Sequence, residues 1–174
     1  MGNDGATNVP GLRIAGDLTG IPLLKFAADS GVKAVRAFAA ELATAKAAPG
    51  PDLAIIGGGV SGIAAAIEAR RIGTSFVVFE ASQPFFTIAN FPKKKPIYTD
   101  PADFKPAGEL QMQAIVKRGL TGGIGSPAAS GWHRVHPRAG RVDANGVAVL
   151  DLLPASRLQI QASLSLQDPQ IPQR

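Results

Sequence analysis

Three glycines at a fixed spacing are the residues of this chain that point most directly to chemistry. Gly57, Gly59 and Gly62 form the pattern G-x-G-x-x-G directly after the apolar run Leu53 to Ile56, which is typical of a parallel strand buried on both faces. The first glycine permits a tight turn, the second lets a diphosphate approach the backbone, and the third lets the following helix pack closely. Free N–H groups at the start of that helix attract an anion. The pattern therefore predicts a binding site for the diphosphate of a dinucleotide.

A carboxylate follows the second apolar run of the same segment. Phe76 to Phe79 predicts another buried strand, and Glu80 at its end lies roughly twenty residues beyond the glycines, where a carboxylate accepts hydrogen bonds from the adenosine ribose hydroxyls. Between the two strands the sequence predicts a helix that ends before Gly73, with Glu68 on its solvent-facing side. The two strands are therefore expected to be parallel neighbours in one sheet.

A second motif precedes the glycines. The segment from Thr7 to Asp17, followed by residues 18–27, resembles the C-terminal flavin motif of thioredoxin-reductase-like flavoproteins of the pyridine-nucleotide-disulfide type. In that family a short strand ends in Gly-Asp, and the aspartate holds the ribityl chain of FAD. The resemblance implies this role for Asp17, with Gly16 allowing close approach. A helix is expected from about Pro22 to Leu42, with its N-terminus facing the flavin end of the cofactor.

The two motifs occur in the reverse of the family's order. The family places the glycine-rich strand near the start of the FAD domain and the Gly-Asp strand near its end, whereas here the Gly-Asp strand comes first and residues 47–51 link the two motifs. Either one flavoprotein module ends near Ala45 and another begins near Asp52, or the two pieces form one site in cis as a circular permutation. A Pro-Gly-Pro linker fits both interpretations.

The resemblance continues beyond Glu80 and then stops. Residues 81–120 resemble the loop and helix that follow the second strand in these flavoproteins, and a helix is expected over about 107–118 with Leu110 inward. Strand Leu12 to Ala15 is expected in the same sheet, beside Leu53 to Ile56. Because the resemblance ends abruptly, a truncated gene product or a change of reading frame is one explanation for the remaining sequence.

The sequence after about Thr121 has a different composition. It is rich in Gly, Ala, Ser, Pro, Arg and Gln without a sustained period, which predicts an irregular or disordered tail that can be deleted without effect. Residues 147–150 and 158–166 are the segments there that could form short strands or a frayed helix. His133 and His136 have a spacing suited to a metal, but no cysteine or nearby carboxylate pair supports them, so no metal site is expected.

Composition limits the functions that this chain can have. Its 174 residues, 45% of them hydrophobic, suffice for one domain but not for the FAD and NAD(P) domains of a whole reductase. The absence of cysteine excludes a C-x-x-C redox disulfide. The net charge of +5 is spread along the chain and does not favour nucleic-acid binding. No signal peptide or apolar run of membrane length occurs, which predicts a cytoplasmic protein without a membrane partner.

The sequence therefore predicts a partial α/β fold with a Rossmann-type parallel sheet and flanking helices. Its expected parts are a Gly-Asp strand and helix over 1–46, a βαβ dinucleotide-binding unit over 52–120 and the tail over 121–174. The expected function is that of a truncated FAD-binding module of a flavin-dependent oxidoreductase, inactive by itself. The alternatives are a non-catalytic remnant and an NAD-binding domain, the second of which would have no use for Asp17. Another flavoprotein module or a second copy is the expected protein partner.

No catalytic acid, base or nucleophile can be assigned from the sequence. The residues expected to bind FAD, or NAD in the alternative, are Gly16, Asp17, Gly57, Gly59, Val60, Ser61, Gly62, Glu80 and Ala81.

Overall fold

The computed structural model describes backbone and side chains for residues 2–45, 50–92 and 99–112. It describes the backbone alone for residues 96–97 and for short strands at 115–116, 132–134, 140–142, 148–150 and 159–162. Most of the predicted tail over 121–174, and the side chains of His133 and His136, therefore lie outside the described residues.

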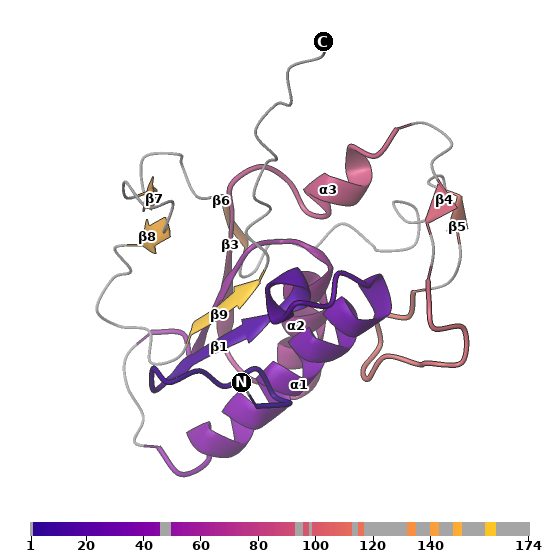
Figure 1. Cartoon of the computed structure of the whole chain (residues 1–174). Coiled ribbons are helices and arrows are strands. Elements are labelled where there is room, and N and C mark those ends of the chain that lie inside the picture. Colours follow the sequence, from indigo (N-terminus) through magenta and orange to yellow (C-terminus); the bar gives the residue numbers. More distant parts are fainter. Residues whose placement is uncertain are drawn as a thin grey trace.

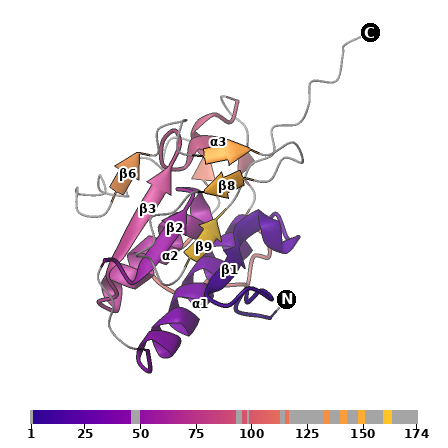
Figure 2. The ribbon, with the colours of Figure 1, turned by 90° about the vertical axis from the view of Figure 1, so that its left-hand side faces the viewer.

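A parallel sheet of five strands forms the centre of the molecule, in the order β1-β9-β2-β3-β6. The arrows of these strands point the same way in Figure 2. Because β2 and β3 pair in parallel with Leu53 opposite Phe76, the expected strand neighbours and the α/β fold class are confirmed. The strands are β1 (Leu12–Ala15), β9 (Gln159–Ala162), β2 (Leu53–Ile56), β3 (Phe76–Glu80) and β6 (Trp132–Arg134).

Strand β1 joins the predicted sheet, but its predicted neighbour was wrong. Strand β9 lies between β1 and β2, so that Gln159 is opposite Leu12 on one side and opposite Ala54 on the other. A helical crossover between parallel strands leaves room for an intervening strand, and β9 supplies ladder partners to both inner edges. The backbone of β9 falls within the segment 158–166, for which a strand or a frayed helix was expected.

Two long helices cover one face of this sheet (Figure 1). Helix α1 (Leu24–Leu42) follows β1, and α2 (Val60–Arg71) connects β2 to β3. Their buried aliphatic side chains pack on those of the strands, with Phe38 and Val35 from α1 against Leu53 and Ile55 from β2. The helices approach each other so closely that a Cβ atom on Gly31 would lie 2.1 Å from the Ser61 carbonyl oxygen. The predicted helix over 22–42 is confirmed, beginning at Leu24.

Glu68 was expected to face solvent, and that expectation was wrong. Its side chain is fully buried because α1 covers this side of α2. Arg71 Nη2 and Arg36 Nε each donate to Glu68 Oε1 at 2.7 Å, and Arg71 Nε donates to Oε2 at 2.9 Å. The hydrogen bonds from Arg71 and then Arg36 outweigh desolvation and lower the pKa of Glu68 to about 2. The buried carboxylate therefore links the two helices.

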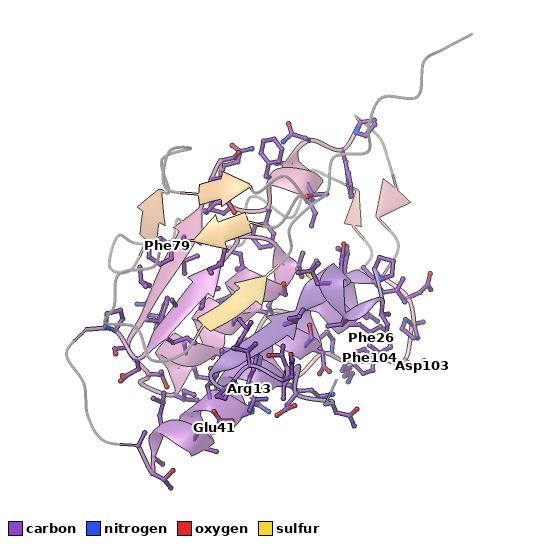
Figure 3. All side chains as sticks on the ribbon, turned by 60° about the vertical axis from the view of Figure 1, so that its left-hand side comes forward. Arg13, Phe26, Glu41, Phe79, Asp103 and Phe104 are labelled. Carbon is purple, nitrogen blue, oxygen red and sulfur yellow. The ribbon has the colours of Figure 1, made fainter. Side chains whose placement is uncertain are left out.

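A segment after β3, residues 99–112, packs along the N-terminal half of α1. Lys25 Nζ donates to the carbonyl oxygens of Pro101 and Ala102 at 2.7 and 3.0 Å. The rings of Phe26 and Phe104 stack with centroids 4.6 Å apart, as Figure 3 shows. Leu110 is buried there, as expected, in a cluster shared with both helices. This segment therefore fixes the outer side of α1.

The helix predicted over 107–118 does not form in the part of that range that is described. Gly108 has a φ of 81°, which no helix interior contains. The Gln111 side-chain amide donates to the carbonyl oxygens of Pro106 and Gly108 at 3.1 and 2.8 Å, groups that a helix would have used. Residues Ile115–Val116 form β5, which pairs antiparallel with β4 (Pro96–Ile97).

The outer edge of β1 is covered by the N-terminal residues. Ile14 N donates to the Gly5 carbonyl at 2.9 Å, and Thr7 N donates to the Leu12 carbonyl at 3.3 Å. Arg13, buried above the Phe38 ring, also binds Asp4 and Glu41, and Figure 3 labels it beside Glu41 on α1. These contacts fix the strand that precedes Gly16 and Asp17. Among the remaining elements, β7 (Gly140–Val142) and β8 (Ala148–Leu150) form a separate antiparallel pair, and α3 (Phe86–Ala89) follows β3.

Candidate functional site

The glycine-rich turn begins where β2 ends. Gly57 has a φ of 99°, a conformation that strains any residue with a Cβ atom. Its N–H donates to the Phe79 carbonyl at 2.8 Å, which extends the pairing of β2 with β3 by one residue. The turn then leads at once into α2, whose first backbone bond runs from Ile63 N to the Gly59 carbonyl at 2.9 Å. The sequence predicted this strand, turn and helix correctly.

The start of α2 has the properties of an anion site. Gly59 is its N-cap, and among the described residues no side chain caps the helix there, so the N–H groups of the first turn lack the partner that Ser, Thr or Asp at the N-cap would supply. Ser61 in that turn is 1% exposed, and no residue that the structure describes hydrogen-bonds its hydroxyl. A buried polar group without a partner is costly. The uncapped helix start suits a phosphate group, whereas the Ser61 hydroxyl is enclosed by protein and does not reach the surface.

Glu80 contacts the glycine turn directly. Its Oε2 accepts a hydrogen bond from Gly58 N at 2.6 Å, and its Oε1 accepts one from Ser82 N at 2.8 Å. A carboxylate has about four acceptor positions, so two bonds leave capacity for ribose hydroxyls. A Cβ atom on Gly58 would lie 3.1 Å from Glu80 Oε2. A side chain at residue 58, which the sequence pattern does not specify as glycine, would therefore displace the carboxylate slightly.

The loop after β3 returns to the same turn. Phe85 N donates to the Gly58 carbonyl at 2.8 Å, and Phe85 itself has a φ of 56° and a ψ of 30°. A bulky residue in this left-handed region costs roughly 1 to 3 kcal/mol. Such strain persists only where surrounding contacts fix it. Nothing in the sequence signals a left-handed Phe85, so the sequence analysis missed this residue. Ala81, which was expected to bind cofactor, is exposed at the start of this loop.

Asp17 lies in a short 3-10 helix, η1 (Gly16–Thr19), directly after β1. Gly16 has a φ of 77°, and its N–H donates to Ser30 Oγ of α1 at 2.9 Å. The Thr19 hydroxyl donates to the Gly16 carbonyl at 2.8 Å. Partial desolvation raises the pKa of Asp17, although the residue is exposed overall. Among the described residues, none hydrogen-bonds its carboxylate, which is therefore available to a ligand.

The two motifs reach the same edge of the sheet. Strands β1 and β2 both run parallel to β9, so that Asp17 and the glycine turn both follow carboxyl ends of strands, where α/β sheets bind ligands. Helix η1 lies against α2, with Cα separations of 8 Å or less. Residues 7–42 therefore do contact the glycine-rich unit, as a site formed in cis requires.

These features are those of a Rossmann-type dinucleotide fold, in which a glycine turn and a strand-end carboxylate share one sheet edge. Comparison with known proteins agrees: residues 52–89 match the protein family described as FAD binding domain. That segment, which runs from β2 to α3, is an FAD-binding domain fragment of a flavoprotein. No curated protein and no solved structure matches the chain. The likeness to thioredoxin-reductase-like flavoproteins in particular stays a prediction.

The part of the chain that the structure describes contains neither a candidate metal cluster nor a membrane-spanning helix. Over 2–45, 50–92 and 99–112, there is no cluster of three or more His, Cys, Asp or Glu residues that could hold a metal ion. Within the same part of the chain, every helix is too short or too polar to cross a membrane.

Proposed function

We propose that this chain binds FAD as the dinucleotide-binding module of a flavin-dependent oxidoreductase. One observation carries this proposal. The uncapped start of α2 and the free carboxylate of Asp17 lie at the same edge of the sheet. A dinucleotide needs both, because its diphosphate is an anion and its sugar hydroxyls are donors. The family match over residues 52–89 supports FAD as the dinucleotide.

Each part of the site has a distinct task in this proposal. The N–H groups at Gly59, Val60, Ser61 and Gly62 bind the diphosphate, helped by the positive end of the α2 dipole. Glu80 accepts hydrogen bonds from the adenosine ribose at its remaining acceptor positions. Asp17, which Gly16 orients, accepts hydrogen bonds from the ribityl hydroxyls. Ala81 lies beside the adenosine end.

The bound flavin supplies the redox step, in which its isoalloxazine ring accepts and passes on electrons. The chain itself binds and orients the cofactor. With no cysteine it has no disulfide of its own to reduce, and another flavoprotein module or a second copy of the chain is the proposed protein partner. We expect the isolated chain to be inactive, and the proposal includes a thioredoxin-reductase-like origin and a cytoplasmic location.

A spectral titration of the purified protein with FAD tests the proposal. We expect a red shift of the flavin absorbance and quenching of its fluorescence, with ADP competing for the site. Gly59→Ala is the informative variant, because Gly59 has a φ of −71° that alanine adopts without strain. Its methyl group would obstruct the diphosphate, and we expect FAD affinity to fall by roughly tenfold or more.

The Asp17→Ala variant separates FAD from the alternatives. It should weaken FAD binding by about tenfold, the value of one charged hydrogen bond, and leave ADP binding unchanged. Because the carboxylate must be ionised to accept these bonds, and its pKa is raised in the free protein, FAD affinity should fall as the pH drops into the acid range. Equal binding of NAD and FAD would favour an NAD domain, and no binding of either would favour a non-catalytic remnant.

A further inference from the structure

Both peptide groups of Gly58 are held by residues at the end of β3 and in the loop that follows it. On one side, the Gly58 N–H donates to Glu80 Oε2 at 2.6 Å. On the other side, the Gly58 carbonyl accepts from Phe85 N at 2.8 Å. Gly58 is buried, and its partners Glu80 and Phe85 are half-buried. The middle of the glycine turn is therefore fixed by a neighbouring loop as well as by its own sequence.

The direction of one N–H group follows from the bond to Phe85. The Gly58 carbonyl and the Gly59 N–H belong to the same planar trans peptide, in which the C=O and N–H bonds point in opposite directions. With the carbonyl held toward Phe85, the Gly59 N–H is directed away from that loop. Gly59 begins α2, so this N–H joins the donors at the uncapped helix start.

Phe85 makes this bond from a conformation that its side chain disfavours. A glycine would adopt a φ of 56° without strain. The Phe85 ring packs at the edge of a cluster that includes Val60 and Ile63 of α2. The Phe85 carbonyl accepts a hydrogen bond from Ala89 N at 2.8 Å, which closes the first turn of α3. These contacts, together with the bond to Gly58, keep the turn in its strained form.

We propose that Phe85 is a positioning residue for the diphosphate site, acting through the Gly58 carbonyl to hold the Gly59 N–H as a donor. This inference rests on the proposed function, because it assumes that the turn binds a diphosphate. The backbone conformation at residue 85, rather than the ring, then determines affinity for phosphate-bearing ligands.

Two variants separate conformation from packing. Phe85→Asn removes the ring but keeps a residue that tolerates the left-handed region. Phe85→Ile keeps apolar bulk but is β-branched, so it strongly disfavours that region. Binding of ADP to each protein is measured by calorimetry, and binding of adenosine, which has no phosphate, is measured by ligand-observed NMR. Thermal melting monitors the fold of each variant.

We expect the Asn variant to bind ADP within about twofold of the unsubstituted protein, and the Ile variant to bind it about tenfold more weakly, the value of one hydrogen bond. Adenosine affinity should be equal in all three proteins. The inference is overturned if ADP affinity follows the apolar side chain, if both variants lose it equally, or if neither does. Failure of the unsubstituted protein to bind ADP or FAD would overturn the proposed function as well.

Hydrogen exchange on the unsubstituted protein gives a second test that does not depend on the Ile variant folding. The Phe85 amide should exchange slowly without ligand, because it is bonded to Gly58, and more slowly when ADP is bound. Exchange of this amide at the rate of an unstructured chain, with or without ADP, would overturn the inference.

Discussion

The buried carboxylate of Glu68 should make the stability of this protein depend on acidity in a predictable way. We take the variant Glu68→Gln as the perturbation, because glutamine keeps the shape of the side chain and removes its charge. Arg71 and Arg36, which lower the pKa of Glu68 to about 2, then face a neutral amide with one acceptor oxygen instead of a carboxylate. Both arginines are about half exposed, at 45% and 49%, so water stabilises them in the variant and the fold should survive.

The magnitude follows from the pKa shift. A change from the ordinary value of 4.5 to about 2 corresponds to about 3 kcal/mol at about 1.4 kcal/mol per unit. Screening at the exposed arginines makes this an upper value. A lowered pKa contributes stability above the unfolded value of 4.5, and that contribution is lost as the pH falls from about 5.5 toward 2. At neutral pH the Glu68 carboxylate should therefore contribute about 2 to 3 kcal/mol.

Urea unfolding followed by circular dichroism, at several pH values between 2 and 7, measures this contribution. The difference in free energy of unfolding between the unsubstituted protein and the Gln variant should be constant above pH 6 and shrink toward zero near pH 2. Glu109→Gln removes an exposed carboxylate from the same region and serves as the control, with a change below about 0.5 kcal/mol. A constant difference over the whole pH range would refute the assigned role of Glu68.

Three further perturbations test the packing that positions the site. Gly31→Ala should lower the free energy of unfolding in urea by about 3 kcal/mol or more, because its Cβ would press on the α2 backbone. Gly20→Ala, where the Cβ meets open space, should lower it by only about 1 kcal/mol through backbone strain. Deletion of residues 151–174, which removes β9, should lower the melting temperature by at least about 10 °C. A control chain that ends directly after β9 should melt at the temperature of the full chain. Equal melting temperatures of the two shortened chains would show that β9 is dispensable. Lys25→Met should speed proteolysis within residues 99–112, because it removes the bonds from Lys25 Nζ to the Pro101 and Ala102 carbonyls, and unchanged proteolysis would show that these bonds do not hold the segment.

The glycine turn was predictable because its requirements are local. Gly57 needs a positive φ, the apolar runs before and after α2 indicate buried strands, and Gly73 ends the helix with bonds from Gly73 N and Thr74 N to the carbonyls of Arg70 and Ala69. Each of these depends on residues within one βαβ unit. A single sequence carries that information.

The features that were missed depend on distant parts of the chain. Glu68 is buried only because α1, which precedes the unit, covers it, and helical periodicity alone places charged residues outside. Periodicity also favoured a helix over 107–118, but Gly108 fits under Val32 of α1, where a Cβ would lie 2.8 Å from its Cγ2 atom. The strand between β1 and β2 comes from a segment without a clear pattern. Tertiary packing decided each of these cases.

Strand β9 has a consequence for how the protein is made. The residues proposed to hold the cofactor all lie before residue 82, yet Leu12 pairs with Gln159, so the two halves of the site join one sheet only after the ribosome has added some eighty more residues. At roughly 5 to 20 residues per second this takes several seconds. During that time the facing edges of β1 and β2 lack their strand, and open edges invite pairing with other chains. Nascent chains of this protein should therefore depend on chaperones until β9 emerges.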